Sequence, residues 1–320
     1  MKKNKVFFLA LGFCLVADLS FSQTKLKPLA LLKHEENQLF QNAVFSPDGS
    51  RVVSVGNQGM LYLWDPSQTF PVTFKQVHQG TALSCAYSQD GKYIVTGGEE
   101  KSIKVLLSRD LSEVKTLAGL PAKVREVAMT GNRLVALLQN NEIRIYNTDT
   151  WERVGKPRYA ASNSKIIFSN KGDRFYAWFS SRIYAISAAD GELIQVFNTN
   201  YATPTDLAVS SDGQLLAVGF GQANEILRIY DAHDFKQLKA VKKNGAGDYA
   251  NGLSFFHNSN KLLYLSNAGN PNLMIYDVDK GTNTSVSKGS ATARTSISKD
   301  DSKVILAPKS INSIQLMSIM

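Results

Sequence analysis

A three-strand unit recurs seven times along this chain, and no other feature limits the possible fold as strongly. The unit is clearest at 42–65, where the strand-like runs NAVF, RVVSV and LYLWD are separated by SPDG and GNQG. The turn after the first run recurs as SPDG at 46–49, SQDG at 88–91, TGN at 130–132, NKGD at 170–173, SSDG at 210–213, HNSN at 257–260 and SKDD at 298–301. Successive copies lie 40 to 47 residues apart, a spacing that indicates one supersecondary unit per copy.

Each copy has room for a fourth strand. The third run recurs as LYLWD at 61–65, IKVLL at 103–107, IRIYN at 143–147, IYAIS at 183–187, LRIYD at 227–231, LMIYD at 273–277 and IQLMS at 314–318. A further strand-like run follows, as in VTFKQV at 72–77 and LIQVF at 193–197. Short strands joined by Gly, Asp and Asn turns favour small antiparallel sheets, and helical periodicity is absent after residue 22. We therefore predict an all-β, seven-bladed β-propeller of four-stranded antiparallel blades.

The two ends of the chain predict how the ring closes. The chain stops directly after the third strand of its seventh copy, and a surplus strand, PLALLK at 28–33, precedes the first copy. We predict that this N-terminal strand joins the last blade as its outer strand, so that 23–320 forms a single domain. Deleting 24–34 should cost several kcal/mol, because it strips apolar area from a blade at roughly 25 cal/mol per Å².

The first 22 residues resemble a secretory signal peptide. Three lysines precede the apolar run 6–17, and Ser20 and Ser22 are small residues before a predicted cleavage after residue 22. An uncleaved anchor and lipidation at Cys14 are the alternatives. We predict a chain exported to the periplasm or secreted. No later apolar stretch is long enough for a transmembrane span.

The first copy resembles a repeat of the WD-repeat propeller family. His34 stands where the Gly-His pair of that family ends, SPDG follows the inner strand, and Trp64-Asp65 closes the third strand. The strand pattern extends over the whole predicted domain, but only one of the seven copies has Trp-Asp. The resemblance implies a buried hydrogen-bonded set of His, Ser or Thr, Trp and Asp in each blade. The first copy offers His34, Ser54 and Trp64 for it, with Gln58 at the Asp position.

The second copy matches the family pattern less closely. His78 and SQDG fit the pattern, but the Asp position is Glu100 and the Trp position is Leu106. We therefore interpret His34, Ser54, Trp64, Asp65 and His78 as structural residues.

No chemical motif points to a metal, a cofactor or a covalent nucleophile. The four histidines, His34, His78, His233 and His257, lie in four different copies, and none has a second His or Cys at ligand spacing. There is no G-x-S-x-G motif and no glycine loop that would hold a phosphate. Cys85 is expected to be a small buried side chain rather than a reactive thiol. We expect no metal site, no cofactor and no catalytic residue.

An enzyme remains the alternative, because seven-bladed propellers include lactone hydrolases that work in the axial channel. The predicted inner strands begin at Asn42, Ser84, Arg125, Lys165, Asp206, Asn251 and Arg294. Of these, Lys165, Asp206 and Arg294 carry groups suited to acid–base chemistry. A lactonase site would require the three to approach within hydrogen-bonding reach in the channel.

The leading hypothesis is a binding scaffold without enzymatic activity. The connections between later copies lengthen to RYAASN at 158–163, NTNYATPT at 198–205 and NGAGDYAN at 244–251, and the hairpin GFGQANE at 219–225 is also extended. Propeller geometry places these loops of blades four to six on one face. Aromatic residues on such loops are typical of binding surfaces, which here would comprise Tyr159, Tyr201, Tyr249, Phe220 and Trp178. Alternatively, the tyrosines fold back and close the channel.

Composition favours some partners over others. The densest group of lysines, at 236, 239, 242 and 243, falls on a predicted outer strand, where lysine blocks edge-to-edge aggregation. We therefore expect no nucleic-acid partner. We expect a protein, peptide or glycan partner, and a chain that is a monomer.

Overall fold

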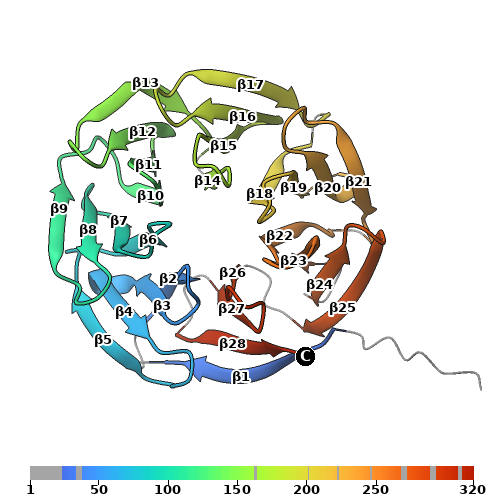
Figure 1. The fold of residues 1–320 in the computed structure, drawn as a ribbon, viewed down its shortest axis with the longest axis horizontal. Coiled ribbons are helices and arrows are strands. Elements are labelled where there is room, and N and C mark those ends of the chain that lie inside the picture. The colour runs from blue at the N-terminus through green and yellow to red at the C-terminus, as the bar shows by residue number, and fades with distance from the viewer. Residues whose placement is uncertain are drawn as a thin grey trace, which may run out of the picture.

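Seven separate four-stranded antiparallel sheets form a ring (Figure 1). The computed structural model describes residues 24–33, 38–161, 164–200, 202–221, 223–245, 247–267, 272–288, 293–308 and 312–320. The only helix within these ranges is the short 3-10 turn η1 (Asn57–Gly59). The predicted all-β, seven-bladed propeller is confirmed.

In blades one to six the strands follow one another in chain order from the inside of the ring outward. Blade one holds β2 (Phe40–Phe45), β3 (Val52–Gly56), β4 (Met60–Trp64) and β5 (Pro71–Gln76). Blade two holds β6 (Ala82–Tyr87), β7 (Tyr93–Gly98), β8 (Ile103–Leu107) and β9 (Glu113–Leu117). Blade three holds β10 (Val124–Thr130), β11 (Arg133–Leu138), β12 (Glu142–Asn147) and β13 (Arg153–Tyr159).

Blade four holds β14 (Ile167–Phe168), β15 (Arg174–Phe179), β16 (Arg182–Ser187) and β17 (Leu193–Asn198). Blade five holds β18 (Pro204–Val209), β19 (Leu215–Phe220), β20 (Glu225–Asp231) and β21 (Gln237–Lys242). Blade six holds β22 (Ala250–Phe255), β23 (Lys261–Ser266), β24 (Asn272–Asp277) and β25 (Thr282–Lys288). The three C-terminal strands of blade seven are β26 (Ala293–Ile297), β27 (Lys303–Pro308) and β28 (Ile314–Ile319).

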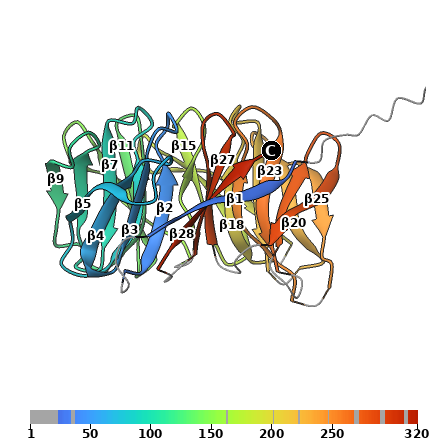
Figure 2. The ribbon, with the colours of Figure 1, turned by 90° about the horizontal axis from the view of Figure 1, so that it is seen from below.

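The N-terminal strand β1 (Leu26–Leu32) completes blade seven. It pairs antiparallel with β28, from Leu26 opposite Ile319 to Leu32 opposite Ile314, and crosses the rim of the ring (Figure 2). Leu26 and Leu32 are buried at the two ends of the strand. The predicted closure of the ring by the N-terminal strand is confirmed.

The core lies between the blades, because each sheet buries both faces against its neighbours. Along β3 every residue is buried, whereas along the outer strand β5 nearly every residue is exposed. The hydrophobic clusters span pairs of adjacent blades, and one joins Tyr176 and Trp178 of blade four to Phe220 and Tyr230 of blade five. The near-continuous apolar runs of the inner strands follow from this two-sided burial.

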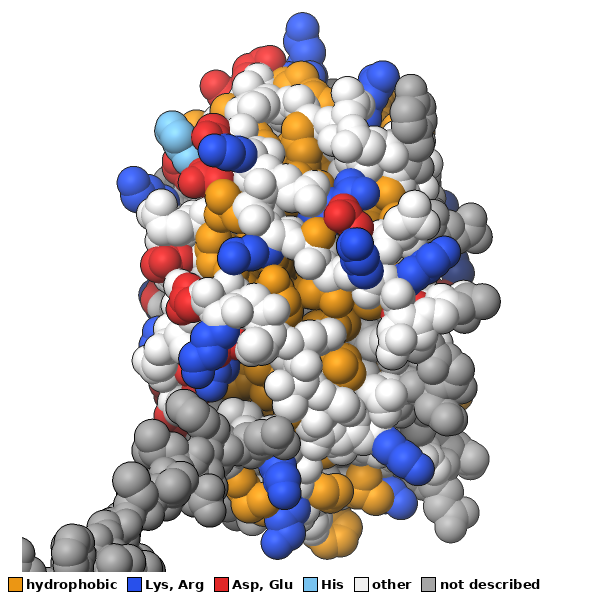
Figure 3. All heavy atoms as spheres, turned by 90° about the vertical axis from the view of Figure 1, so that its right-hand side faces the viewer, with side chains coloured by type: hydrophobic (Ala, Val, Ile, Leu, Met, Phe, Trp, Pro, Cys, Tyr) orange, Lys and Arg blue, Asp and Glu red, His pale blue; other side chains and the backbone are white. Residues whose placement is uncertain are grey.

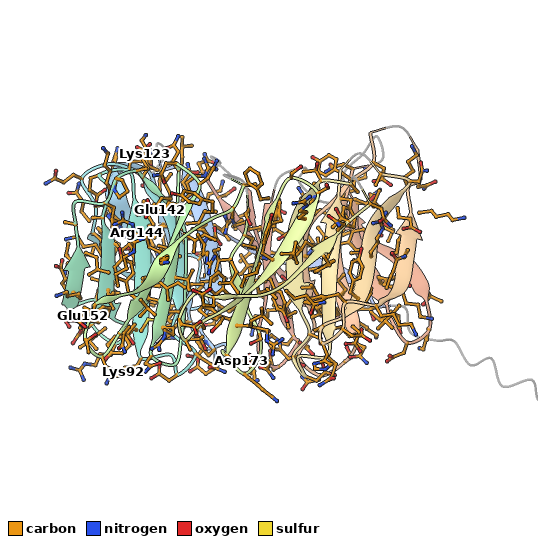
Figure 4. All side chains as sticks on the ribbon, turned by 90° about the horizontal axis from the view of Figure 1, so that it is seen from above. Lys92, Lys123, Glu142, Arg144, Glu152 and Asp173 are labelled. Carbon is orange, nitrogen blue, oxygen red and sulfur yellow. The ribbon has the colours of Figure 1, made fainter. Side chains whose placement is uncertain are left out.

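The two ends of the propeller differ. We call the end with the turns between first and second strands and between third and fourth strands the turn face. The opposite end, with the blade-to-blade connections and the second-to-third-strand hairpins, is the loop face. Figure 4 labels Lys123 at the loop face and Lys92 and Asp173 at the turn face. In Figure 3 carboxylates gather mainly along the edge formed by the turn face, while lysines and arginines spread over the whole view.

The turn face is built from repeated local hydrogen bonds. In the first copy Asp48 accepts from Ser46 Oγ at 2.5 Å and from the Ser50 backbone N–H at 3.0 Å. The turns also bond to one another: Asn170 Nδ2 donates to the Ser211 carbonyl at 2.6 Å, and Ser211 Oγ donates to the His257 carbonyl at 2.6 Å. The acidic turns thus satisfy their own polar groups and link neighbouring blades.

Candidate functional site

The five aromatic residues proposed as a binding surface have different environments. Tyr159 ends β13 on the loop face and is 62% exposed, so it does not close the channel. Tyr249, just before β22, is half-buried, and Tyr201 lies outside the described residues. Trp178 and Phe220 are completely buried, which corrects the expectation that they face a partner.

Trp178 and Phe220 are buried because their strands extend further than the sequence suggested. The hairpin expected at 219–225 is shorter, since β19 continues through Phe220 and β20 begins at Glu225. Both aromatic side chains then point between blades four and five. The Arg228 guanidinium lies 4.7 Å from the centre of the Phe220 ring, which adds a cation–π contact to the packing.

The structure exposes two other residues on the loop face, in the hairpin that follows the strand to which the chain after Tyr159 is bonded. A tight hairpin with Ser180 in the left-handed conformation (φ 54°) joins β15 to β16 and pairs Phe179 with Arg182. Phe179 is 47% exposed and Arg182 is also exposed. We call Tyr159, Phe179 and Arg182 the loop-face patch. The strand end was the signal for it, because Phe179 is the last residue of β15 and the only one of its strand that lies beyond the neighbouring blades.

Backbone and side-chain hydrogen bonds hold this part of the loop face in place. The Ala161 N–H donates to the Trp178 carbonyl at 2.6 Å, which fixes the chain that follows Tyr159 beside β15. Thr199 Oγ1 donates to the Ser181 carbonyl at 2.8 Å, and Arg228 Nη1 donates to the Thr199 carbonyl at 2.9 Å. The connection between blades four and five is thereby tied to both blades.

A buried carboxylate orders the next connection. Asp248 is 2% exposed and accepts hydrogen bonds from the Asn244 N–H at 2.9 Å and from Ser266 Oγ at 2.8 Å. It also accepts from the Asn267 N–H at 3.1 Å. These bonds join the connection between blades five and six to the hairpin of blade six. A surface held this way loses little conformational entropy when a partner binds.

The structural residues of blade one show part of the set implied by the family resemblance. Trp64 Nε1 donates to Ser54 Oγ at 2.8 Å, and both side chains are fully buried. Asp65 lies in the following turn, where it accepts from the Ser67 N–H at 2.9 Å and pairs with Arg51 at 3.0 Å. His34 lies outside the described residues.

Blade two forms a variant of the set. His78 is bonded through Nε2 to Thr96 Oγ1 at 2.8 Å and through Nδ1 to the Glu100 carboxylate, which also accepts from Ser102 Oγ at 2.6 Å. Burial lowers the pKa of His78, although Glu100 acts in the opposite direction. Burial would raise the pKa of Glu100, but the hydrogen bonds from Ser102 and His78 bring it below its ordinary value. We assign a neutral His78 that donates from Nδ1 to an ionised Glu100.

Two ion pairs lie at the inner strands of the axial channel. Arg294 of blade seven reaches Glu126 of blade three with two hydrogen bonds, from Nη1 to Oε1 at 2.9 Å and from Nη2 to Oε2 at 2.6 Å. Lys165 Nζ of blade four lies 3.3 Å from Asp206 Oδ1 of blade five. Burial would lower the pKa of Arg294, but the Glu126 carboxylate raises it above its ordinary value. The first pair therefore braces blades that are far apart in the ring.

The proposed catalytic trio does not form. Lys165 and Asp206 contact each other, but Arg294 is engaged by Glu126. Asp206 is held further by the backbone N–H groups of Leu207 and Leu253, both at 2.8 Å. The hydrolase alternative is therefore not favoured.

Sequence reasoning missed Glu126 because of a bulge. It placed Arg125 at the start of the inner strand, but the register of β10 shifts between Val124 and Glu126. The shift turns Glu126 inward, where it is 6% exposed. Similar shifts precede Asn42 and Ser84, which lie 84 and 42 residues before Glu126, so the repeat spacing was the signal that could have identified it.

No metal site or membrane-spanning helix emerges from the part of the chain that the structure describes. Those residues contain no group of three or more His, Cys, Asp or Glu that could hold a metal ion. No helix among them is long and apolar enough to cross a bilayer. Cys85 is buried, and burial raises the pKa of its thiol far above the ordinary value, as expected of an unreactive side chain.

Comparison with known families identifies the repeats. Residues 27–65 and 69–105 match the model "WD domain, G-beta repeat". The first matched segment spans β1 of blade seven and β2 to β4 of blade one, so the sequence repeat is offset from the blade by one strand. The chain carries WD40 repeats and folds as a seven-bladed propeller.

A solved structure shares the fold over nearly the whole chain. The "Crystal structure of RRP9 WD40 repeats" superposes with a TM-score of 0.74 at 11% identity, covering 92% of this chain and 98% of that chain. At such low identity the likeness concerns the fold alone.

Curated relatives match parts of the chain. "U3 small nucleolar RNA-associated protein 9" of Saccharomyces cerevisiae is 25% identical over 141 residues, covering 43% of this chain and 24% of its own length. "Protein HIR1" of Yarrowia lipolytica is 21% identical over 237 residues, covering 59% of this chain and 22% of its own length. The matched parts are thus less than a quarter of either relative.

The predicted export to the periplasm or beyond is contradicted by this comparison. The Saccharomyces cerevisiae relative is named for association with a small nucleolar RNA, and the nucleolus is neither periplasmic nor extracellular. The apolar run that suggested a signal peptide, within residues 1–22, lies outside the described residues. The prediction of location is therefore wrong: a short apolar run after lysines was too weak a criterion.

Proposed function

We propose that this propeller is a binding scaffold without enzymatic activity that presents its loop face at the junction of blades three and four to a protein partner. The loop-face patch carries this proposal. Tyr159 and Phe179 are 62% and 47% exposed, and Arg182 lies opposite Phe179. Tyr, Phe and Arg are enriched at protein–protein interfaces, where a few such residues supply most of the binding energy.

The setting of the partner is suggested by the relatives. One similar protein is named for association with the U3 small nucleolar RNA. We therefore place the partner within a ribonucleoprotein assembly, with this chain contacting protein through the patch. The charged residues of the channel are paired with one another, so they do not suggest a catalytic reaction.

The test compares two variants, each of which replaces two exposed apolar side chains with serine. The full chain, bearing Tyr159→Ser and Phe179→Ser, is used to capture partners from a cell extract. The control carries Leu193→Ser and Leu238→Ser on the outer rim, where both leucines are exposed to a similar degree. We expect proteins retained by the wild type and by the rim control to be reduced at least tenfold by the patch variant.

Two results would contradict the proposal. Equal loss of partners in both variants would mean that capture depends on apolar surface in general. Loss of the partner after ribonuclease treatment of the extract would show that the chain contacts RNA, and the expectation of no nucleic-acid partner would then be wrong as well. Thermal unfolding of both variants checks that they remain folded.

A further inference from the structure

The outer strands of the blades are the free edges of their sheets, and β17 differs from the others. These outer strands are β1, β5, β9, β13, β17, β21 and β25. Each of the others carries at least one charged residue, such as Lys75 in β5 or Lys239 in β21. The strand β17, with the sequence LIQVFN, has none. Charged residues on an edge strand prevent pairing with a foreign strand, so of these outer edges only that of β17 lacks a protecting charge.

The edge of β17 is accessible and regular toward the loop face. Every residue of the strand except Phe197 is exposed, including the apolar side chains of Ile194 and Val196. In the part of the chain that the structure describes, no hydrogen bond from outside blade four reaches residues 193–198. The register shift of β17 lies before Gln195, so the residues from there to the end of the strand pair regularly with β16. A foreign strand can therefore continue this sheet and be held by main-chain hydrogen bonds.

A row of side chains connects this edge with the loop-face patch. Phe179 lies opposite Arg182, and Arg182 lies opposite Asn198 of β17. Residues directly opposite each other in adjacent strands are on the same face of a sheet, so a strand added beside β17 would place one residue in this row. Because neighbouring strands are about 4.8 Å apart, the backbone of that residue would be roughly 10 Å from the Arg182 backbone, a span that an arginine and a glutamate can bridge.

The charge of Arg182 indicates which residue the added strand should carry there. Arg182 is exposed, and within the described residues its guanidinium has neither an ion pair nor a hydrogen bond. A carboxylate in the row would give it a charge-assisted hydrogen bond. The edge of β17 thus favours uncharged residues along most of an added strand and an acidic residue at the end nearest the loop face.

We propose that β17 binds an extended segment of the protein partner as an added antiparallel strand, whose first residue is acidic and pairs with Arg182 and whose following residues are uncharged. The acidic residue comes first because β17 runs toward the loop face and an antiparallel strand runs away from it. A second copy of β17 fits less well, because the acid beside that strand is Glu192, whose carboxylate is already bonded to Arg158 at 2.6 Å. This inference rests on the proposed function, since it takes the partner to be a protein and states how it is held.

The experiment measures the binding of a fluorescent peptide to the full chain by anisotropy. The probe is a capped peptide of one glutamate followed by alternating valine and threonine. In one control peptide lysine replaces the glutamate, and in another proline replaces a central valine and removes a backbone donor. We expect saturable binding of the probe and at least tenfold weaker binding of both control peptides.

Variants of the chain locate the binding site. Val196→Lys places a charge on the edge of β17 and should weaken binding of the probe at least tenfold. The matched control Val72→Lys makes the same change at an exposed valine of β5 and should leave binding unchanged. Arg182→Gln should abolish the preference for the glutamate peptide over the lysine peptide.

Several results would overturn the inference. These are no saturable binding of the probe, equal binding of the three peptides, or undiminished binding to Val196→Lys. Should Val196→Lys not fold, the three peptides on the wild-type chain decide alone. A dimer of the wild-type chain that Val196→Lys dissociates would identify a second copy as the occupant and would also reject a partner segment.

The same peptide separates this inference from the proposed function. The variant with Tyr159→Ser and Phe179→Ser keeps β17 and Arg182, so it should bind the probe as the wild type does. Capture of partners that depends on the loop-face patch, together with a probe that does not bind, would reject the strand site alone. A probe that binds β17, together with capture that does not depend on the patch, would reject the proposed function alone. The rim control leaves the edge uncharged, because its change in β17 is Leu193→Ser, before the register shift.

Discussion

The turn face and the loop face differ in how they satisfy the polar groups at the ends of the seven sheets. On the turn face one local motif is repeated, in which an aspartate such as Asp48 or Asp212 accepts from a serine two residues earlier and from the backbone two residues later. On the loop face the bonds differ from blade to blade: Arg228 donates to the Thr199 carbonyl, whereas Asp248 accepts from the Asn244 N–H. The first arrangement follows from a motif repeated along the chain, and the second is particular to each blade.

The two faces also differ in how many buried polar atoms have no hydrogen bond. In the described part of the chain, buried side-chain atoms without a hydrogen bond include Trp178 Nε1, Asn42 Oδ1, Asn141 Oδ1 and Glu100 Oε2, all toward the loop face. The Tyr87 hydroxyl is the exception near the turn face. Native folds satisfy most buried polar groups, so unused ones mark places where stability has not been the only constraint. The comparison indicates a turn face that holds the ring together, and it agrees with our proposal that the loop face binds the partner.

The largest effect is expected where the loop-face half of the ring is braced across the channel. Replacing Glu126 with Leu removes the partner of Arg294 and leaves its charge uncompensated. We expect a loss of about 3 kcal/mol in the free energy of unfolding, at the low end for a buried pair because the Arg294 side chain is one-third exposed. Urea denaturation measures the loss.

A double variant separates the charge from the packing. Glu126→Leu combined with Arg294→Met removes both charges and should recover most of the lost stability, because an apolar pair replaces an ion pair at little cost. A double variant that is no more stable than Glu126→Leu would show that the bridge is not what holds these strands.

A smaller loss of stability is expected when one aspartate on each face is replaced with alanine. Asp248→Ala leaves three donors without an acceptor in a buried position, and should cost about 2–3 kcal/mol. Asp212→Ala removes a comparable carboxylate from an exposed turn, and should cost about 1 kcal/mol or less because water replaces the lost bonds. Equal losses in urea denaturation would erase the distinction between the faces.

A third comparison uses the two fully buried tryptophans. Trp64→Phe and Trp178→Phe remove the same apolar area, but only Trp64 loses a hydrogen bond, to Ser54. Trp64→Phe should therefore be more destabilising by about 1–2 kcal/mol. If Trp178→Phe costs as much, its indole N–H has a hydrogen-bond partner in the fold.

The same contrast explains what the sequence could predict. The turns and strands repeat, so their number and the closure by β1 followed from spacing alone. The ion pairs of the channel could not be predicted from spacing. A one-residue bulge turns Glu126 inward where the sequence suggested Arg125, and the partner of Glu126 lies 168 residues away. The aromatic residues were misjudged for a related reason: Trp178 and Phe179 differ by one position, and the strand end decides which is buried. Local patterns fix the elements, but side-chain direction depends on registers that only the folded sheets reveal.

The smallest effect per residue is expected when acid protonates the aspartates of the turn face and lowers the stability of the fold. Hydrogen bonds from the Ser112 side chain and backbone, aided by Arg109, lower the pKa of Asp110 to about 2. Similar serine bonds lower the pKa of Asp48 and Asp90 below their ordinary value near 3.8. A lowered pKa in the fold means that the contribution to stability is complete above the unfolded pKa of about 3.9 and is lost as pH falls through the folded pKa.

We therefore expect the thermal midpoint to be level from pH 7 to about pH 5 and to fall between about pH 4 and pH 2. Replacing Asp90 and Asp110 with Asn should make that fall shallower, because the amides do not titrate. The matched control is Asp234→Asn, an exposed turn aspartate whose carboxylate accepts from the Lys236 N–H. An unchanged slope in the double variant would show that acid acts on other carboxylates, and that the turn motif of this face holds its geometry through the serine and backbone bonds without its charge.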